Sequence, residues 1–197
     1  MALAVVHSRA QVGIEAPPVT VEVHLANGLP SLSIVGLPET AVKESKDRVR
    51  AALLNARFDF PARRITVNLA PADLPKEGGR FDLPIALGIL AASEQLPVAA
   101  LDRHEFLGEL ALTGELRPIG GALAAALALR GGRSLVLPAM NAPEAALVEG
   151  AQAYGATDLL AIVAHLRGEA LLSPEPIGVP AEPSCTEPDM RDISGQP

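Results

Sequence analysis

The spacing of apolar residues changes several times along the chain, and each change predicts a different element. Residues 19–25 and 31–35 alternate apolar and polar side chains, and Asn27-Gly28 between them favours a hairpin. From Pro38 to about Ala56 the period becomes helical, and Ser45 shares the apolar face. Further short runs predict strands at 2–6, 65–69, 106–110, 115–117, 134–137 and 152–155.

The most informative stretch is the junction at residues 74–90, where a charged, glycine-containing loop runs into an uncharged segment. No charge occurs from Leu83 to Ala92, and a helix that is apolar on every side is a buried one. We therefore predict a core helix from Leu83 to Ser93, with Asp82 as its N-cap. The N-terminus of such a helix is able to hold an anion or an oxyanion.

In the second half, predicted helices at 122–129, 142–149 and 158–167 alternate with the short strands, as in layered α/β proteins. We predict one folded domain at residues 1–167. After Gly168 the composition changes and indicates a linker over residues 168–188, marked by Pro174, Pro176, Pro180, Pro183 and Pro188.

Composition excludes several classes of protein. With 197 residues, 49% of them hydrophobic, the chain is long enough to bury a core. A single cysteine, Cys185, gives no disulfide framework, and no apolar run approaches the roughly 20 residues that span a bilayer, so we expect a cytoplasmic protein without a membrane partner. The four histidines are scattered without cysteine or carboxylate at ligand spacing, and no metal site is expected.

Charge is unevenly distributed. The net charge of −7 argues against a strong polyanion binder, yet residues 39–82 carry nine Lys or Arg against seven Asp or Glu. Any DNA contact is therefore expected there, and an ordinary solvated surface is the alternative. The candidates for phosphate contacts, or equally for subunit contacts, are Arg57, Arg63, Arg64, Lys76 and Arg80.

Three long segments carry a resemblance to a known family: PPVTVEVHLANGLPSLSIVGLPETAVKESKDRVRAAL, RRITVNLAPADLPKEGGRFDLPIALGILAA and FLGELALTGELRPIGGALAAAL. They closely resemble the N-terminal domain of the ComM/YifB family, the magnesium-chelatase-like AAA+ ATPases of bacteria. The resemblance implies an α/β (α+β) fold like the Lon proteolytic domain and domain 2 of ribosomal protein S5. For the longer protein it implies ATP and Mg²⁺, a hexameric ring, and branch migration of DNA in natural transformation and recombination.

The same resemblance permits a test for proteolysis, because Lon-type proteases use a serine nucleophile and a lysine base. PKEGGRFDLP and RPIGGALA hold the corresponding places. The serine position falls on Asp82, or on Arg80 without an inserted residue, and the lysine position falls on Leu123. All three lysines precede the core helix, and a carboxylate at Asp82 would oppose an oxyanion, so we expect no catalytic residues.

No nucleotide site is expected in this chain either, because no lysine is followed by Ser or Thr as G-x-x-x-x-G-K-[ST] requires. The last residues, PDMRDISGQP, resemble the lead-in to the AAA+ module, so residues 189–197 are interpreted as the start of a truncated module. Three hypotheses follow: an assembly and DNA-contact domain of a motor, a pure oligomerisation or partner-docking module, and, less favoured, a residual peptidase.

Overall fold

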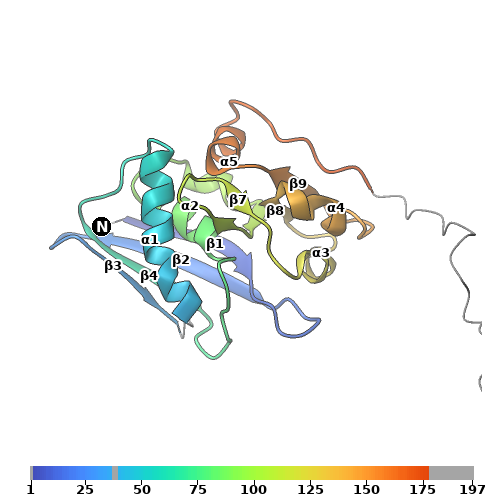
Figure 1. Cartoon of the computed structure of the whole chain (residues 1–197), viewed down its shortest axis with the longest axis horizontal. Helices are drawn as coiled ribbons and strands as arrows, with labels where there is room; N and C mark the ends of the chain where they lie inside the picture. The colour runs from blue at the N-terminus through green and yellow to red at the C-terminus, as the bar shows by residue number, and fades with distance from the viewer. Residues whose placement is uncertain (1, 37–39, 178–197) are drawn as a thin grey trace, which may run out of the picture.

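The computed structural model describes residues 2–36 and 40–177, and its first half is built on one four-stranded sheet (Figure 1). The sheet contains β1 (Ala2–Arg9), β2 (Pro18–Ala26), β3 (Ser31–Val35) and β4 (Arg64–Ala70) in the order β1-β2-β4-β3. β1, β2 and β4 are antiparallel neighbours, whereas β3 runs parallel to β4.

The predicted hairpin of residues 19–35 is wrong, although both of its strands exist. β4 lies between β2 and β3 and pairs with each of them, so Leu25 and Leu32 both face Ile65 in the register. A turn signal such as Asn27-Gly28 fixes where the chain reverses. It does not fix which strand, local or distant, fills the adjacent edge.

Two helices cover one face of this sheet. They are α1 (Thr40–Asn55), whose expected start at Pro38 lies outside the described residues, and α2 (Asp82–Ala92). All eleven residues of α2 are buried, which confirms the core helix. Close approach to the sheet needs Gly88, because a Cβ there would lie 2.4 Å from a methyl group of Val23.

The second half forms a smaller parallel sheet in the order β5-β8-β9, from β5 (His104–Phe106), β8 (Ser134–Pro138) and β9 (Ala153–Ala156). The predicted hairpin of 106–110 and 115–117 is shorter, with β6 (Glu109–Leu110) paired to β7 (Leu116–Arg117). Three helices complete this part: α3 (Ala122–Leu129), α4 (Ala142–Ala145) and α5 (Leu159–Leu166).

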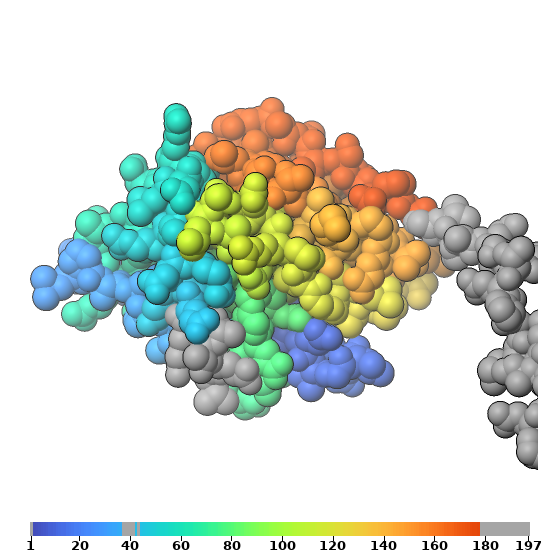
Figure 2. Space-filling model, in the orientation of Figure 1, coloured from blue at the N-terminus to red at the C-terminus, as the bar shows by residue number. Residues whose placement is uncertain are grey.

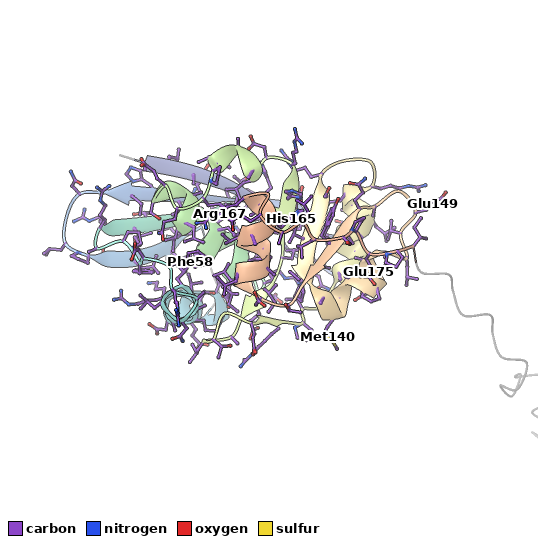
Figure 3. All side chains as sticks on the ribbon, turned by 90° about the horizontal axis from the view of Figure 1, so that it is seen from above. Phe58, Met140, Glu149, His165, Arg167 and Glu175 are labelled. Carbon is purple, nitrogen blue, oxygen red and sulfur yellow. The ribbon has the colours of Figure 1, made fainter. Side chains whose placement is uncertain are left out.

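The first part of the predicted linker, residues 168–177, contacts β9, whereas its remainder, 178–188, and the predicted start of a truncated module, 189–197, lie outside the described residues. The Glu175 N–H donates to the Ala153 carbonyl at 2.8 Å, and Pro174 bridges to Tyr154. Figure 3 shows Glu175 on this segment beyond His165 of α5. Among the described residues, no helix is long and apolar enough to cross a membrane. The described architecture is α+β, with sheets in both halves and helices packed against them.

Candidate functional site

The junction predicted to matter most is occupied by a buried carboxylate, that of Asp82. Arg48 of α1 donates to it through Nε, 2.7 Å from Oδ2, and through Nη2, 3.1 Å from Oδ1. Ser45 Oγ donates to the same Oδ1, and the backbone N–H of Leu110 donates to Oδ2 at 3.2 Å. One side chain therefore joins α1, α2 and β6.

The predicted N-cap role of Asp82 is wrong. Asp82 is the first residue of α2, the cap position belongs to Phe81, and no side chain caps this helix. Because the carboxylate turns toward α1, its oxygens accept from another element. Asp158 plays the capping role that was expected here, since its side chain accepts from the Ala161 N–H at the start of α5.

The electrostatics of this cluster are those of a structural ion pair. Burial raises the pKa of Asp82, and the hydrogen bonds from Arg48 and Ser45 oppose that rise. The hydrogen bond to Asp82 in turn raises the pKa of Arg48. A two-pronged guanidinium contact is a strong form of charge-assisted hydrogen bonding, and it favours the ionised form of the carboxylate.

Lys76 and Arg80, two of the predicted candidates for phosphate or subunit contacts, are buried. Lys76 has no exposed surface, and its ammonium donates to the backbone carbonyls of Gly36, at 2.9 Å, and Pro71. Arg80 is only 8% exposed. Burial lowers the pKa of both groups, and both cations serve internal contacts.

Arg80 joins the two loops that correspond to the Lon catalytic segments. Its Nη2 donates to the Gly120 carbonyl at 3.1 Å and to Gln11 Oε1 at 2.7 Å. Figure 2 shows the blue loop after β1 beside the green loop before α2. The 75–80 loop and the 118–121 turn therefore meet in space, as the resemblance implies, and they line a cavity of about 310 Å³.

The residues at this meeting point lack the parts of a serine–lysine pair. Leu123, at the lysine position, carries a hydrocarbon side chain that is 38% exposed. The hydroxyl next to Asp82 is that of Ser45, which is fully buried and bonded to the carboxylate. A nucleophile must reach its substrate and needs a base beside it. Ser45 cannot reach a substrate because it is buried, and the carboxylate that accepts its hydrogen bond is held in an ion pair with Arg48.

Of the other three predicted cations, Arg63 and Arg64 lie at the opposite end of β4 from Lys76. Arg57 follows α1, and Arg63 and Arg64 stand at the start of β4, whereas Lys76 follows its end. Seven residues of β4 at roughly 3.3 Å each separate the ends by about 20 Å. The five cations therefore do not form one patch.

Arg57, Arg63 and Arg64 are all exposed, and none of them forms an ion pair with another described residue. Sequence reasoning missed Arg50, whose guanidinium lies 4.7 Å from the Phe60 ring centroid. Its place on the exposed face of α1 was the available signal. We call Arg50, Arg57, Arg63 and Arg64 the arginine end. Two carboxylates, Asp59 and Glu94, line a cavity beside Arg63.

The histidines are less scattered than the sequence suggested. The His104 and His165 ring centroids are 5.4 Å apart, and Tyr154 packs within 6.1 Å of both. Within residues 2–36 and 40–177, no group of three or more His, Cys, Asp or Glu side chains is placed to hold a metal. The Leu172 N–H donates to His165 Nδ1 at 3.1 Å, which ties residues 168–177 to α5.

The fold and the site define an α+β domain whose helix junction is filled by a buried ion pair. A model of the family described as subunit ChlI of Mg-chelatase matches residues 21–141, more than half of the chain, so the chain belongs to this family.

Individual relatives are more similar still. The chain is 51% identical over 197 residues to the uncharacterized protein YifB of Salmonella typhimurium, covering 100% of this chain and 39% of that protein. It is 58% identical over 173 residues to the competence protein ComM of Haemophilus influenzae, covering 87% and 34%. The resemblance to the ComM/YifB group is confirmed, and the chain spans about two-fifths of the YifB relative's length.

A more distant match is to Lon protease 2 of Thermus thermophilus, 32% identical over 140 residues, covering 64% of this chain and 16% of that protein.

Proposed function

We propose that this chain is a non-proteolytic, Lon-like domain of a ComM-type AAA+ DNA motor, and that it serves ring assembly and DNA contact. In this proposal the domain has the fold of the Lon proteolytic domain and of domain 2 of ribosomal protein S5. The matches to ComM and to a Lon protease support that assignment. ATP, Mg²⁺, a hexameric ring, branch migration and a cytoplasmic location are proposed for the longer protein.

The observation that carries the DNA part is the arginine end. Its guanidinium groups are displayed at the surface, whereas Lys76, Arg80 and Arg48 are engaged inside the domain. Arginine is suited to phosphate because its planar donors form paired hydrogen bonds. A few exposed cations on a chain of net charge −7 support weak, salt-sensitive binding.

The carboxylate of Asp82 is the main reason to expect no proteolysis. A fixed carboxylate at the helix N-terminus disfavours the negative charge of a tetrahedral intermediate. Arg48 already satisfies that carboxylate, so the pair stabilises the domain and needs no substrate. Incubation with a serine-reactive phosphonate tests this argument: we expect no labelling, and covalent labelling of any serine would contradict it.

The second candidate is a docking module without DNA contact, and α3 supports it. Every residue of α3 is apolar, yet Leu123 and Leu127 are 38% and 56% exposed. α3 packs on α4, and Met140, in the turn between β8 and α4, is 79% exposed. Figure 3 shows Met140 pointing away from the domain. A surface of this kind fits a neighbouring subunit, which both hypotheses include.

Fluorescence anisotropy with a labelled oligonucleotide separates the two candidates. We expect weak binding by the 197-residue chain at low salt, and at least a tenfold loss when Arg57, Arg63 and Arg64 are all changed to Gln. The matched control changes Arg103, Arg117 and Arg130 to Gln, which removes equal charge from exposed positions elsewhere. Equal losses in both variants would leave only the docking module.

A further inference from the structure

The contacts of Arg80 inside the domain do not satisfy all the hydrogen-bond donors of its buried guanidinium. The residue is only 8% exposed, and its guanidinium donates to two neutral oxygens, those of Gln11 and Gly120. The second terminal nitrogen, Nη1, is buried and has no hydrogen-bond partner among the described residues. A buried charge with an unfilled donor is costly, and in native proteins such a group calls for an explanation.

The guanidinium lies between two cavities that open beside it. One, of about 310 Å³, is lined by the 77–80 loop, Glu109 and the 118–120 turn. The other, of about 410 Å³, is lined by Pro75, Glu77 and the loop after β1. Arg80 and Gln11 line both of them. A ligand of a few heavy atoms would therefore meet the guanidinium from either side.

The walls of the first cavity allow close approach to the backbone. Gly78, Gly79 and Gly120 line it without side chains, and Gly78 would have nothing within 4 Å of an added Cβ. Loops of this kind bring peptide groups up to small anions more readily than loops with bulky side chains.

The charges around the cavity restrict the ligand. Glu77 and Glu109 both line it, so a multiply charged anion would be repelled. Glu109 is partly balanced by Arg117, whose Nη1 lies 3.6 Å from its Oε1. A carboxylate carries one negative charge and two oxygens in a plane. It therefore matches the forked guanidinium of Arg80 and the limited positive charge around the cavity.

We propose that Arg80 and the two glycine loops form a binding site for a carboxylate group. The carboxylate supplies the acceptor that Nη1 lacks, and it forms the ion pair that Arg80 does not form with Glu77 among the described residues. This site is independent of the DNA contact proposed above, because it lies at the other end of the sheet and uses none of the arginine end.

The test is a titration of the isotope-labelled 197-residue chain with sodium acetate at constant ionic strength, read by backbone NMR. We expect saturable shifts at Gly78, Gly79 and Gly120, and a weakening of at least tenfold in Arg80→Gln. The matched control, Arg130→Gln, removes the same charge from an exposed position that lines neither cavity and should retain binding. Equal weakening in both variants would contradict a specific role for Arg80.

Two further arms keep the proposal falsifiable. Gln11→Trp keeps the Arg80 side chain and fills both cavities from an exposed position, so we expect it to abolish the acetate shifts. This variant provides the test if Arg80→Gln does not fold. Inorganic phosphate at equal ionic strength should bind at least tenfold more weakly than acetate. Shifts that never saturate with acetate, or phosphate binding as tight as acetate, would overturn the carboxylate site.

Discussion

The buried Asp82 side chain lies at a helix N-terminus, where an external anion could bind, and instead links neighbouring elements of the domain. Its carboxylate has no exposed surface and accepts hydrogen bonds from Arg48, Ser45 and Leu110. The same helix N-terminus that would stabilise an external anion therefore lies beside an internal one. Removing the charge leaves Arg48 without its main partner.

We expect Asp82→Asn to lower the free energy of unfolding by about 3 kcal/mol, measured by urea denaturation. This is the low end of the usual range for a broken buried pair, because the Arg48 side chain is 21% exposed. For a domain of this size the melting temperature should fall by roughly 6–12 °C.

The control for this prediction removes both charges at once. Asp82→Leu combined with Arg48→Met should be more stable than either single substitution, since no buried charge is left unpaired. A loss below about 0.5 kcal/mol in Asp82→Asn would mean that the pair contributes little.

For single residues, the sequence does not reveal which side chains or carbonyl groups become hydrogen-bond partners. It singled out Asp82 and placed Ser45 on the apolar face of its helix, yet it did not join them across 37 positions. A polar residue on a buried face was the available signal, because such a group needs a buried partner. Lys76 and Arg80 were misplaced since charge alone favours exposure, whereas the folded loops supply carbonyl acceptors for both.

Among the elements, α2 is the one that the rest of the first half packs around. Its uncharged sequence left a buried helix as the only consistent interpretation, and the predicted bounds differ from the observed ones by one residue. The order of the sheet was not predictable in the same way. β4 pairs with β2 and β3 through contacts about 40 residues apart in sequence, which local patterns do not encode.

The close contact between α2 and β2 predicts both the direction and the size of the stability change in Gly88→Ala. Gly88→Ala gains about 1 kcal/mol of helix propensity, but the new methyl group would lie 2.4 Å from Val23 Cγ2. We expect a net loss of about 1–2 kcal/mol in chemical denaturation. Combining it with Val23→Ala should recover stability relative to Val23→Ala alone, and a more stable Gly88→Ala would refute the close packing.

The segment at 168–177 should respond to pH through α5. Burial lowers the pKa of His165, and burial, then the neighbouring His165 and Arg103, lower the pKa of His104, both from 6.5. The unfolded chain then binds more protons than the folded domain. Stability is therefore full above about pH 6.5 and is lost as the pH falls from there through the lowered folded pKa values.

Hydrogen exchange gives this pH effect a local readout. Protonation of His165 at Nδ1 removes the acceptor of the Leu172 N–H, so protection of that amide should fall between pH 7 and pH 5 after correction for intrinsic rates. His165→Gln should show a weaker dependence on pH. Protection of Leu172 that is unchanged across this range would contradict the tie.

On the scale of the whole domain, the cations of the basic segment are divided between two ends of the larger sheet. One end holds Lys76, Arg80 and the buried Asp82 pair, and the other displays the arginine end. The sequence shows that residues 39–82 are basic, but it does not divide that segment, whereas β4 carries its two halves about 20 Å apart.

The salt dependence of DNA binding tests the central claim most directly. Each phosphate contact adds about 0.7–0.9 to the slope of log affinity against log salt. Neutralising Arg57, Arg63 and Arg64 together should therefore reduce the slope of the 197-residue chain by about 2–3, while the Arg103, Arg117 and Arg130 control leaves it unchanged. An unchanged slope in the first variant would contradict DNA contact by this domain.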